Sequence, residues 1–258
     1  MNVQGKAAII TGGGTGVGRA AALGLARLGC SVLVNYSRSR QDAEATAVEI
    51  EKLGVRALAF EADVSDDAAC RKMVDAALAA FGRLDVLVNS AGTTRFIPHT
   101  ALDLVTDDDW ERIFAVNVKG PFQCIRAARA PMVAAGGGAV VNVSSIAGIS
   151  ATGSSIPYAA SKAALINMTV SLARALAPTI RVNSVAPGFI AGRWLEQGLG
   201  SQYEAVKAKV AQGTPTGRVC TPEDVGQTIV GLITGSDQIT GQTLVCDGGM
   251  LIAEPVRR

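Results

Sequence analysis

The 258-residue sequence has few aromatic residues, only 4%, and it contains a single histidine and no basic block. No apolar run approaches the ~18 residues that a membrane-spanning helix needs, so we expect no membrane partner. Lys and Arg together number 24 against 22 acidic residues, and this balance predicts no nucleic-acid partner. The N-terminus lacks a charged segment followed by an apolar segment and a cleavage site, which predicts a cytoplasmic protein.

The sequence also has few charged residues, and its cysteines show no paired spacing. The five cysteines are odd in number, scattered and never spaced as C-x-x-C. This spacing predicts buried, reduced thiols and indicates neither a disulfide framework nor a metal site. Charged residues make up 18% of the chain, which is low for the surface of a monomer and predicts that some surface is buried in an oligomer.

Strand-like and helix-like stretches alternate along the whole chain. Short apolar runs predict strands at 6–11, 31–36, 55–62, 84–92, 138–145, 180–188 and 242–249. Helical spacing predicts helices at 18–29, 40–54, 66–82 with Ser65 as its cap, 107–132, 157–177, 201–212 and 222–233. Strands this apolar, each followed by a helix, predict an α/β fold. We expect one Rossmann-like domain over 1–258, with a doubly wound parallel sheet of about seven strands covered by helices on both faces.

A glycine-rich turn, TGGGTGVG at residues 11–18, joins the first predicted strand to the first predicted helix. Each glycine forced into a helix or strand destabilises the fold by about 0.5–1 kcal/mol, so a cluster of glycines without a structural or functional role is unfavourable. A P-loop would need Lys and then Ser or Thr after Gly18, but Arg19 and Ala20 follow. G-x-G-x-x-G fails as well, because Val17 and Arg19 stand where its third glycine would be. Bare N–H groups at a helix N-terminus favour phosphate, so the turn predicts a bound dinucleotide, with a plain tight turn as the alternative.

Further polar motifs end other predicted strands, where open α/β sheets bind ligands. They are Asp63-Val64, NSAG at 89–92, NVSS at 142–145, YAASK at 158–162 and Pro187-Gly188. Together with T-G-x-x-x-G-x-G, these motifs resemble the short-chain dehydrogenase/reductase family over nearly the whole chain. The resemblance is greatest to 3-oxoacyl-(acyl-carrier-protein) reductases and sugar dehydrogenases. The extended branch of the family would need glycine at Thr15.

The resemblance implies a catalytic set of Asn117, Ser145, Tyr158 and Lys162. Hydride transfer to a carbonyl leaves a developing alkoxide, which needs a proton and a hydrogen-bond donor. Tyr158 is the candidate acid/base, and Lys162, one helical turn away, is expected to lower its pKa from the ordinary value of about 10. Ser145 is implied to bond the substrate oxygen, with Ser144 as the adjacent alternative. Asn117 is implied to hold a water that links the lysine to solvent.

The resemblance also implies contacts to a nicotinamide dinucleotide. Asp63 and Val64 would contact the adenine, Lys162 the nicotinamide ribose, and Pro187 and Gly188 the nicotinamide. The full expected cofactor-binding set is Gly12, Thr15, Gly16, Val17, Gly18, Tyr36, Ser37, Arg38, Asp63, Val64, Asn89, Ala91, Gly92, Tyr158, Lys162, Pro187, Gly188 and Ile190.

The end of the second predicted strand favours NADP(H) as the cofactor, with NAD(H) as the alternative. NAD-preferring members carry an acidic residue there that bonds the adenosine ribose. Tyr36 takes that position here, and Ser37 and Arg38 follow it. Arginine suits bidentate phosphate contacts, so these residues are expected to hold a 2′-phosphate.

Substrate selection is expected to depend on a variable lid at about 189–220. Gly192 stands where the family often has a threonine that bonds the carboxamide or a phosphate, and Arg193 or a backbone N–H could substitute. Phe189 and Trp194 are interpreted as either a substrate wall or core packing, and His99 as a loop residue. The predicted partner is a small carbonyl or alcohol, such as a 3-oxoacyl thioester. A sugar, a steroid or another small ketone is the alternative, or a catalytically silent dinucleotide-binding protein. The family implies a homotetramer.

Overall fold

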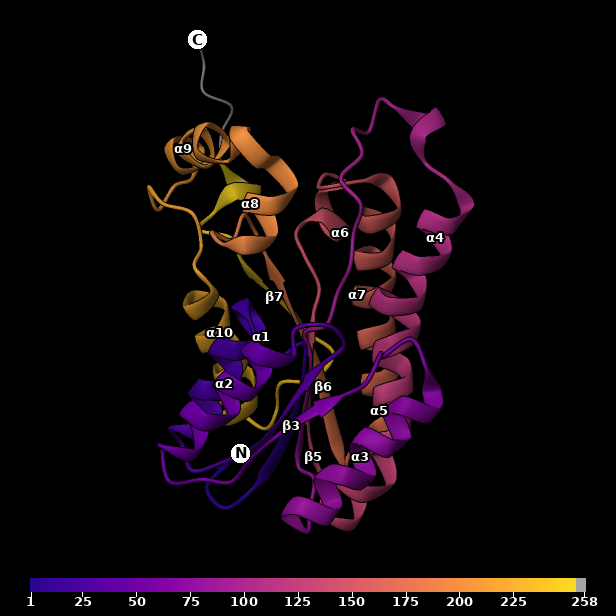
Figure 1. Ribbon diagram of the computed structural model, residues 1–258, viewed down its shortest axis with the longest axis vertical. Helices are drawn as coiled ribbons and strands as arrows, with labels where there is room; N and C mark the ends of the chain where they lie inside the picture. The colour runs from indigo at the N-terminus through magenta and orange to yellow at the C-terminus, as the bar shows by residue number, and fades with distance from the viewer. Residues whose placement is uncertain (254–258) are drawn as a thin grey trace.

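The computed structural model describes residues 1–253, and they form a seven-stranded parallel sheet between two layers of helices (Figure 1). The strand order is β3-β2-β1-β4-β5-β6-β7. The strands are β1 Ala7–Thr11, β2 Ser31–Tyr36, β3 Ala57–Glu61, β4 Val86–Asn89, β5 Gly138–Val143, β6 Ile180–Pro187 and β7 Thr243–Cys246. The predicted doubly wound parallel sheet is thereby confirmed, whereas 254–258 of the predicted domain lie outside the described residues.

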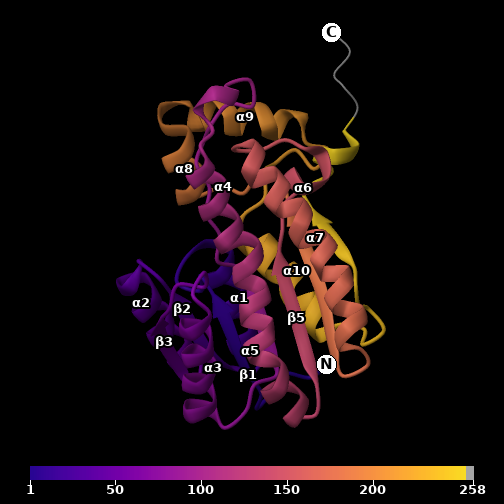
Figure 2. The same cartoon turned by 90° about the vertical axis from the view of Figure 1, so that its right-hand side faces the viewer.

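Helices cover both faces of the sheet (Figures 1 and 2). One face carries α1 (Gly16–Ala26), α2 (Arg40–Glu51) and α10 (Pro222–Thr234), and α10 packs on α1. The other carries α3 (Asp67–Phe81), α5 (Gly120–Ala134) and α7 (Ile156–Leu176). Shorter helices lie toward the carboxyl ends of the strands: α4 (Asp107–Phe114), α6 (Ala147–Ser150), α8 (Arg193–Leu199) and α9 (Tyr203–Gly213).

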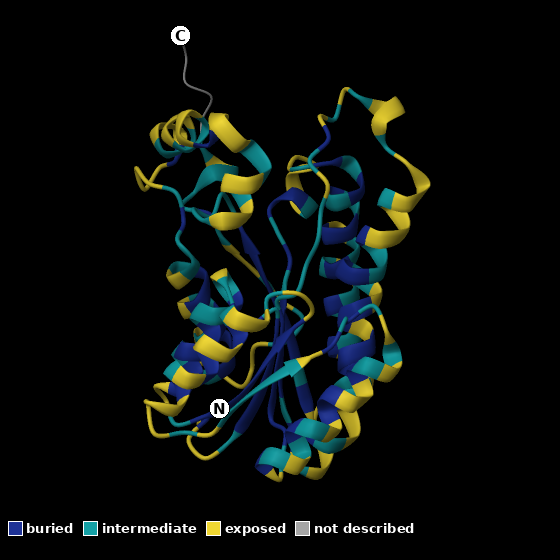
Figure 3. Cartoon of the chain, in the orientation of Figure 1, coloured by how far each residue is buried: buried dark blue, intermediate teal, exposed yellow. Residues whose placement is uncertain are grey.

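The central strands are mostly apolar because both faces of the sheet are covered. Ala8 and Ile10 of β1 pack in the core beneath α1 and α10, while Ala7 and Ile9 pack beneath α3 and α5. Neighbouring residues thus point to opposite cores, as the two-residue period of a strand requires. Figure 3 shows the central strands buried and many exposed positions on the outer faces of the helices, while the edge strands β3 and β7 are only partly buried. Burial of each such aliphatic side chain contributes about 1.5–3 kcal/mol.

Two local predictions were wrong, and one short helix was not predicted. Helix α3 is capped by Asp66, whose carboxylate accepts from the N–H groups of Ala68 and Ala69. Ser65 instead donates to Asp63, 2.7 Å away, because the Asp63 carboxylate lies within its reach. The predicted helix 107–132 is divided by a π-helical turn at Ala115–Lys119, with α4 before it and α5 after it. Helix α8 was not predicted, because its seven residues show no clear apolar stripe.

Cysteine, metal and membrane features add little to this picture. All five cysteines are free; Cys246 is partly exposed and the other four are buried. Within residues 1–253, no group of three or more His, Cys, Asp or Glu side chains is placed to hold a metal ion. Over the same residues, no helix combines the length and apolarity needed to cross a membrane.

The strand order reverses between β1 and β4, which lie side by side in the middle of the sheet. Chain connections leave these two strands in opposite directions and open a crevice at their carboxyl ends. Thr11 pairs with Asn89 at this point. The glycine turn and the NSAG segment therefore meet at the switch point of the sheet.

Candidate active site

A cavity of about 1340 Å³ opens at the carboxyl ends of the strands. Ligand pockets commonly measure about 300–1,000 Å³, so this one has room for a dinucleotide together with a substrate. Its wall includes every predicted cofactor-binding residue except Gly18 and Asn89. Of the four predicted catalytic residues, Ser145, Tyr158 and Lys162 line it, and Asn117 does not.

The glycine turn forms one end of the cavity, and at two of its glycines a side chain would meet neighbouring backbone atoms. A Cβ on Gly12, which has φ +62°, would lie 3.1 Å from the backbone of Ala91. A Cβ on Gly18 would collide with the Gly12 carbonyl, so Gly18 serves the packing of α1 against the turn. Thr15 is the N-cap of α1, but its side chain accepts no backbone N–H. The first N–H groups of α1 therefore remain for an anion, as a dinucleotide phosphate requires.

Asn89, a member of the expected cofactor-binding set, does not line the cavity. Its side chain is buried and donates to Asn142 Oδ1 at 2.8 Å, and Asn142 donates in turn to Thr169 at 2.9 Å. These bonds connect β4, β5 and α7 beneath the cavity. Asn89 is thus outside the cavity wall because its amide is used within the sheet.

The segment after β2 lines the cavity with one aromatic and two polar residues. Tyr36 is buried, and the guanidinium carbon of Arg40 lies 6.0 Å from its ring centroid. Arg40 also pairs with Glu61 at 3.4 Å. Ser37 and Arg38 are exposed at the rim, and Arg38 makes no ion pair within the described part of the chain. Arg38 therefore places a positive charge without an ion-pair partner at this rim, within the described residues.

Asp63 lies at the end of the cavity beyond β3. Its Oδ1 accepts from the backbone and hydroxyl of Ser65, and its Oδ2 accepts from Arg112 at 3.0 Å. Burial opposes the charge, but these bonds outweigh it and lower the pKa of Asp63. No sequence pattern indicates Arg112, which comes from α4 and reaches the carboxylate only in the folded chain.

Ser145, Tyr158 and Lys162 meet at the other end of the cavity. Ser145 follows β5, while Tyr158 and Lys162 lie on one face of α7. Ser155 caps this helix by accepting from the N–H of Tyr158. Lys162 is buried; its Nζ donates to the Val143 carbonyl at 2.9 Å and lies 5.6 Å from the Tyr158 ring centroid.

The protonation states differ from the expected ones. Burial raises the pKa of Tyr158, and a hydrogen bond with Ser145 partly opposes this. Burial lowers the pKa of Lys162 to about 8. The expected lowering of the Tyr158 pKa by Lys162 is not found, because the ammonium bonds Val143 and lies over the face of the ring.

The two adjacent serines have separate environments. Ser144 is buried, donates to the Val185 carbonyl at 2.8 Å and accepts from the Ser184 hydroxyl at 2.9 Å. Its hydroxyl is therefore used between β5 and β6. Ser145 accepts from the Ala147 N–H at 3.1 Å and bonds Tyr158, so it is the serine that stands beside the tyrosine in the cavity.

Asn117 is fully buried in the π-helical turn. Its Oδ1 accepts from the Thr93 N–H at 2.8 Å, and its Nδ2 donates to the Thr93 carbonyl and the Ser161 hydroxyl, both at 3.0 Å. The side chain thus joins the segment after β4 to α7. π-turns recur at functional sites, and this one is beside the cavity rather than in its wall.

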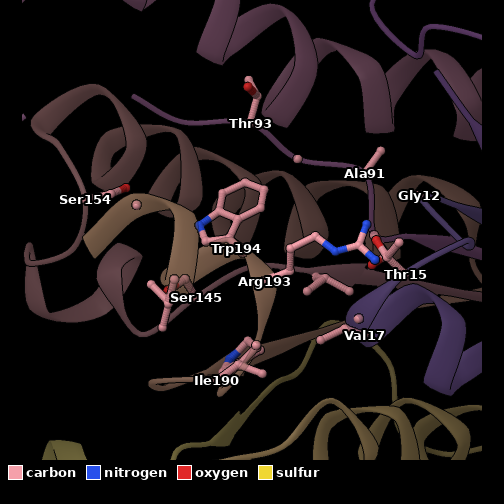
Figure 4. A pocket seen from close by; sticks show the side chains of 18 of the residues that line it. Gly12, Thr15, Val17, Ala91, Thr93, Ser145, Ser154, Ile190, Arg193 and Trp194 are labelled. Atoms are coloured by element: carbon pink, nitrogen blue, oxygen red, sulfur yellow. The ribbon is translucent and has the colours of Figure 1, made fainter. Parts of the chain in front are cut away.

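The lid closes the cavity from the side of β6. Phe189 and Trp194, which the sequence left as either wall or core residues, both line the cavity. Phe96 lines it as well. Figure 4 shows Trp194 and Arg193 projecting into it from α8. His99 also lines the cavity, and its Nε2 is buried without a hydrogen-bond partner among residues 1–253.

Known proteins resemble this chain over most of its length. A family model described as enoyl-(acyl carrier protein) reductase matches residues 12–251. A candidate ketoacyl reductase of the granaticin polyketide synthase of Streptomyces violaceoruber is 43% identical, covering 94% of each chain. The 3-oxoacyl-[acyl-carrier-protein] reductase FabG of Staphylococcus aureus is 37% identical, covering 95% of this chain and 98% of that one.

Two solved structures share the fold. One is described as a short-chain dehydrogenase/reductase from Burkholderia xenovorans, with a TM-score of 0.89, 38% identity, and coverage of 96% of this chain and 98% of that one. The other is a gluconate 5-dehydrogenase from Burkholderia cenocepacia in complex with NADP and tartrate, with a TM-score of 0.88, 32% identity and 98% of each chain covered. The chain therefore belongs to the short-chain dehydrogenase/reductase family of NAD(P)-dependent oxidoreductases.

Proposed function

We propose that this protein uses NADPH to reduce the ketone of a 3-oxoacyl thioester to a secondary alcohol. One observation carries the proposal: Ser145, Tyr158 and Lys162 meet in the same cavity whose other end is the bare N-terminus of α1. The first group suits a developing alkoxide, and the second suits a dinucleotide phosphate.

The chain supplies the proton and the hydrogen bonds of this reaction. A bound nicotinamide dinucleotide supplies the hydride. Tyr158 is protonated at neutral pH, because burial raises its pKa, and so it can give its proton to the alkoxide oxygen. Ser145 donates to the same oxygen. Lys162, with a pKa of about 8, is mostly charged at neutral pH. Because its Nζ bonds the Val143 carbonyl and does not lower the Tyr158 pKa, its proposed role is to hold the nicotinamide ribose.

Apolar side chains in the cavity wall support an acyl substrate. They include Phe96, Ile97, Phe189, Trp194, Leu199 and Val206. An alkyl chain buried there gains about 0.8 kcal/mol per methylene group, whereas sugar hydroxyls would lose hydrogen bonds to water. Two relatives are named as ketoacyl or 3-oxoacyl reductases. The similar gluconate 5-dehydrogenase supports a sugar acid as the alternative substrate.

A substrate panel tests the activity. The loss of NADPH absorbance would be followed with acetoacetyl and longer 3-oxoacyl thioesters, 5-ketogluconate, aldoses and diketones. We expect the highest kcat/KM with 3-oxoacyl thioesters and a rise with chain length. A higher kcat/KM with the sugar compounds would show that the substrate is a sugar and not a 3-oxoacyl thioester. Dinucleotide binding without any turnover would contradict the enzymatic proposal.

We expect the rim after β2 to make NADPH the preferred cofactor over NADH. Arg38→Gln removes a cation from the proposed 2′-phosphate site and is expected to lower kcat/KM for NADPH about tenfold, because a charge-assisted phosphate bond is lost. NADH, which has no 2′-phosphate, should be unaffected. Arg40→Gln is the matched control, since Arg40 is engaged by Tyr36 and Glu61. A clear NADH preference of the unaltered protein would contradict the assignment.

Assembly as a homotetramer in the cytoplasm stays a prediction. Large apolar side chains are exposed on α5 at Phe122 and Val133 and on β7 at Leu244 and Val245. Exposed apolar surface of this kind supports contacts between subunits.

A further inference from the structure

Helix α8 places two neighbouring side chains in the cavity, and they point in different directions (Figure 4). Arg193 extends toward Thr15 at the start of α1. Trp194 points toward the reactive group instead: the tip of its ring lies 3.9 Å from where a Cβ on Gly92 would be, and Lys162 Nζ lies 3.8 Å from the same point. The two side chains thus occupy the path between the glycine turn and Lys162.

The Arg193 guanidinium is held there by a carboxylate 151 residues away in sequence. It donates to both oxygens of Asp42, at 2.9 and 3.2 Å. Asp42 is in the first turn of α2, which packs directly on the glycine turn. Thr46 fixes that contact by donating to the Gly14 carbonyl at 3.2 Å and to the Asp42 carbonyl at 2.9 Å. Arg193 is therefore positioned beside the bare N–H groups of α1.

This ion pair is easily exchanged. The side chain of Arg193 is 60% exposed and that of Asp42 is 34% exposed. Ion pairs with this exposure contribute little to stability. A phosphate group also offers two oxygens that one guanidinium can bond at the same time, and such charge-assisted bidentate bonds are among the stronger hydrogen bonds.

We propose that Arg193 is a phosphate-binding residue of the dinucleotide site, and that its guanidinium exchanges the Asp42 carboxylate for the cofactor diphosphate. The inference rests on the proposed function. The diphosphate is the phosphate concerned, because Arg193 points toward Thr15 at the start of α1, where the helix N–H groups are not capped by the Thr15 side chain (Figure 4). Asp42 then competes with the cofactor for Arg193, and Trp194, the next residue of the same short helix, moves with it.

Calorimetric titration of the full chain with NADPH and with NADH tests the exchange. Arg193→Gln is expected to weaken both about tenfold, since both carry the diphosphate. Asp42→Asn is expected to tighten both about threefold, because the competitor is removed. In the Arg193→Gln background, Asp42→Asn should have no effect. Arg38→Gln is the matched control, because it should weaken NADPH alone.

Several results would overturn the exchange. If Asp42→Asn still tightened binding in the Arg193→Gln background, Asp42 would act by direct repulsion. If Arg193→Gln weakened 2′,5′-ADP but not ADP, Arg193 would serve the 2′-phosphate. Unchanged affinities in Arg193→Gln would contradict this inference alone, whereas failure of the unaltered chain to bind either dinucleotide would contradict the proposed function as well.

A second measurement follows the lid directly. In a Trp110→Phe background, Trp194 is the one remaining tryptophan of the two in the chain. ADP, which lacks the nicotinamide, should change Trp194 emission when Arg193 is present and should leave it unchanged in Arg193→Gln. An equal change in both proteins would contradict the link between Arg193 and the movement of α8.

Discussion

Tyr158→Phe is expected to lower kcat for carbonyl reduction about 10²–10⁴-fold, the usual range for loss of a general acid. The phenyl ring keeps the volume of the phenol and removes only the hydroxyl that bonds Ser145. Dinucleotide binding should therefore change by less than about threefold, as calorimetry would measure. Single-turnover absorbance of NADPH gives the rate of the chemical step.

The chain contains its own matched control for this change. Tyr203 is buried, and Lys207 lies one turn further on, with its Nζ 5.3 Å from the Tyr203 ring centroid. The Tyr203 hydroxyl accepts from the Gly192 N–H at 3.1 Å and is not part of the cavity wall. Tyr203→Phe should keep kcat within about threefold. Equal losses in both variants would show that general damage, and not the missing acid, lowers the rate.

Lys162→Met is expected to lower kcat/KM at least about 10²-fold and, at the same time, to stabilise the protein without cofactor. A folded-state pKa of about 8, against the ordinary 10.5, means that burial disfavours the ammonium. This corresponds to about 3 kcal/mol at neutral pH. Methionine removes that cost but leaves the Val143 carbonyl without its donor, a loss of about 1–3 kcal/mol. We expect a net gain of about 1 kcal/mol in the free energy of unfolding.

The pH dependence gives this prediction a sign that can be checked. Between pH 8 and 10.5 the unfolded chain holds the Lys162 proton while the folded chain has released it, so the stability contribution of this group rises with pH. The advantage of Lys162→Met in urea unfolding should therefore be full at pH 7 and smaller at about pH 9.5. Lys207→Met, at a partly exposed position paired with Glu204, is the control and should show no such trend. An advantage that did not shrink with pH would contradict a buried ammonium as its cause.

The two Tyr–Lys pairs show how far the sequence pattern reaches. Tyr158 with Lys162 and Tyr203 with Lys207 have the same spacing, and both lie on helices. The motifs around Tyr158 and Lys162 predicted a reactive role for the first pair, whereas the Tyr–Lys spacing alone could not distinguish the two pairs. The structure separates them, because only the first pair is in the wall of the cavity that the glycine turn also lines.

The sequence by itself determined the fold, the glycine turn and the residues that end the strands, because strand and helix periods and turn motifs are local properties of the chain. Only the tertiary structure placed Ser145 in the cavity and used Ser144 and Asn89 within the sheet. It also brought Arg193 to Asp42, a contact between segments too far apart in sequence for any local pattern to indicate. Such positions depend on which groups burial and hydrogen bonding leave free, and those are settled only when the sheet and the lid assemble.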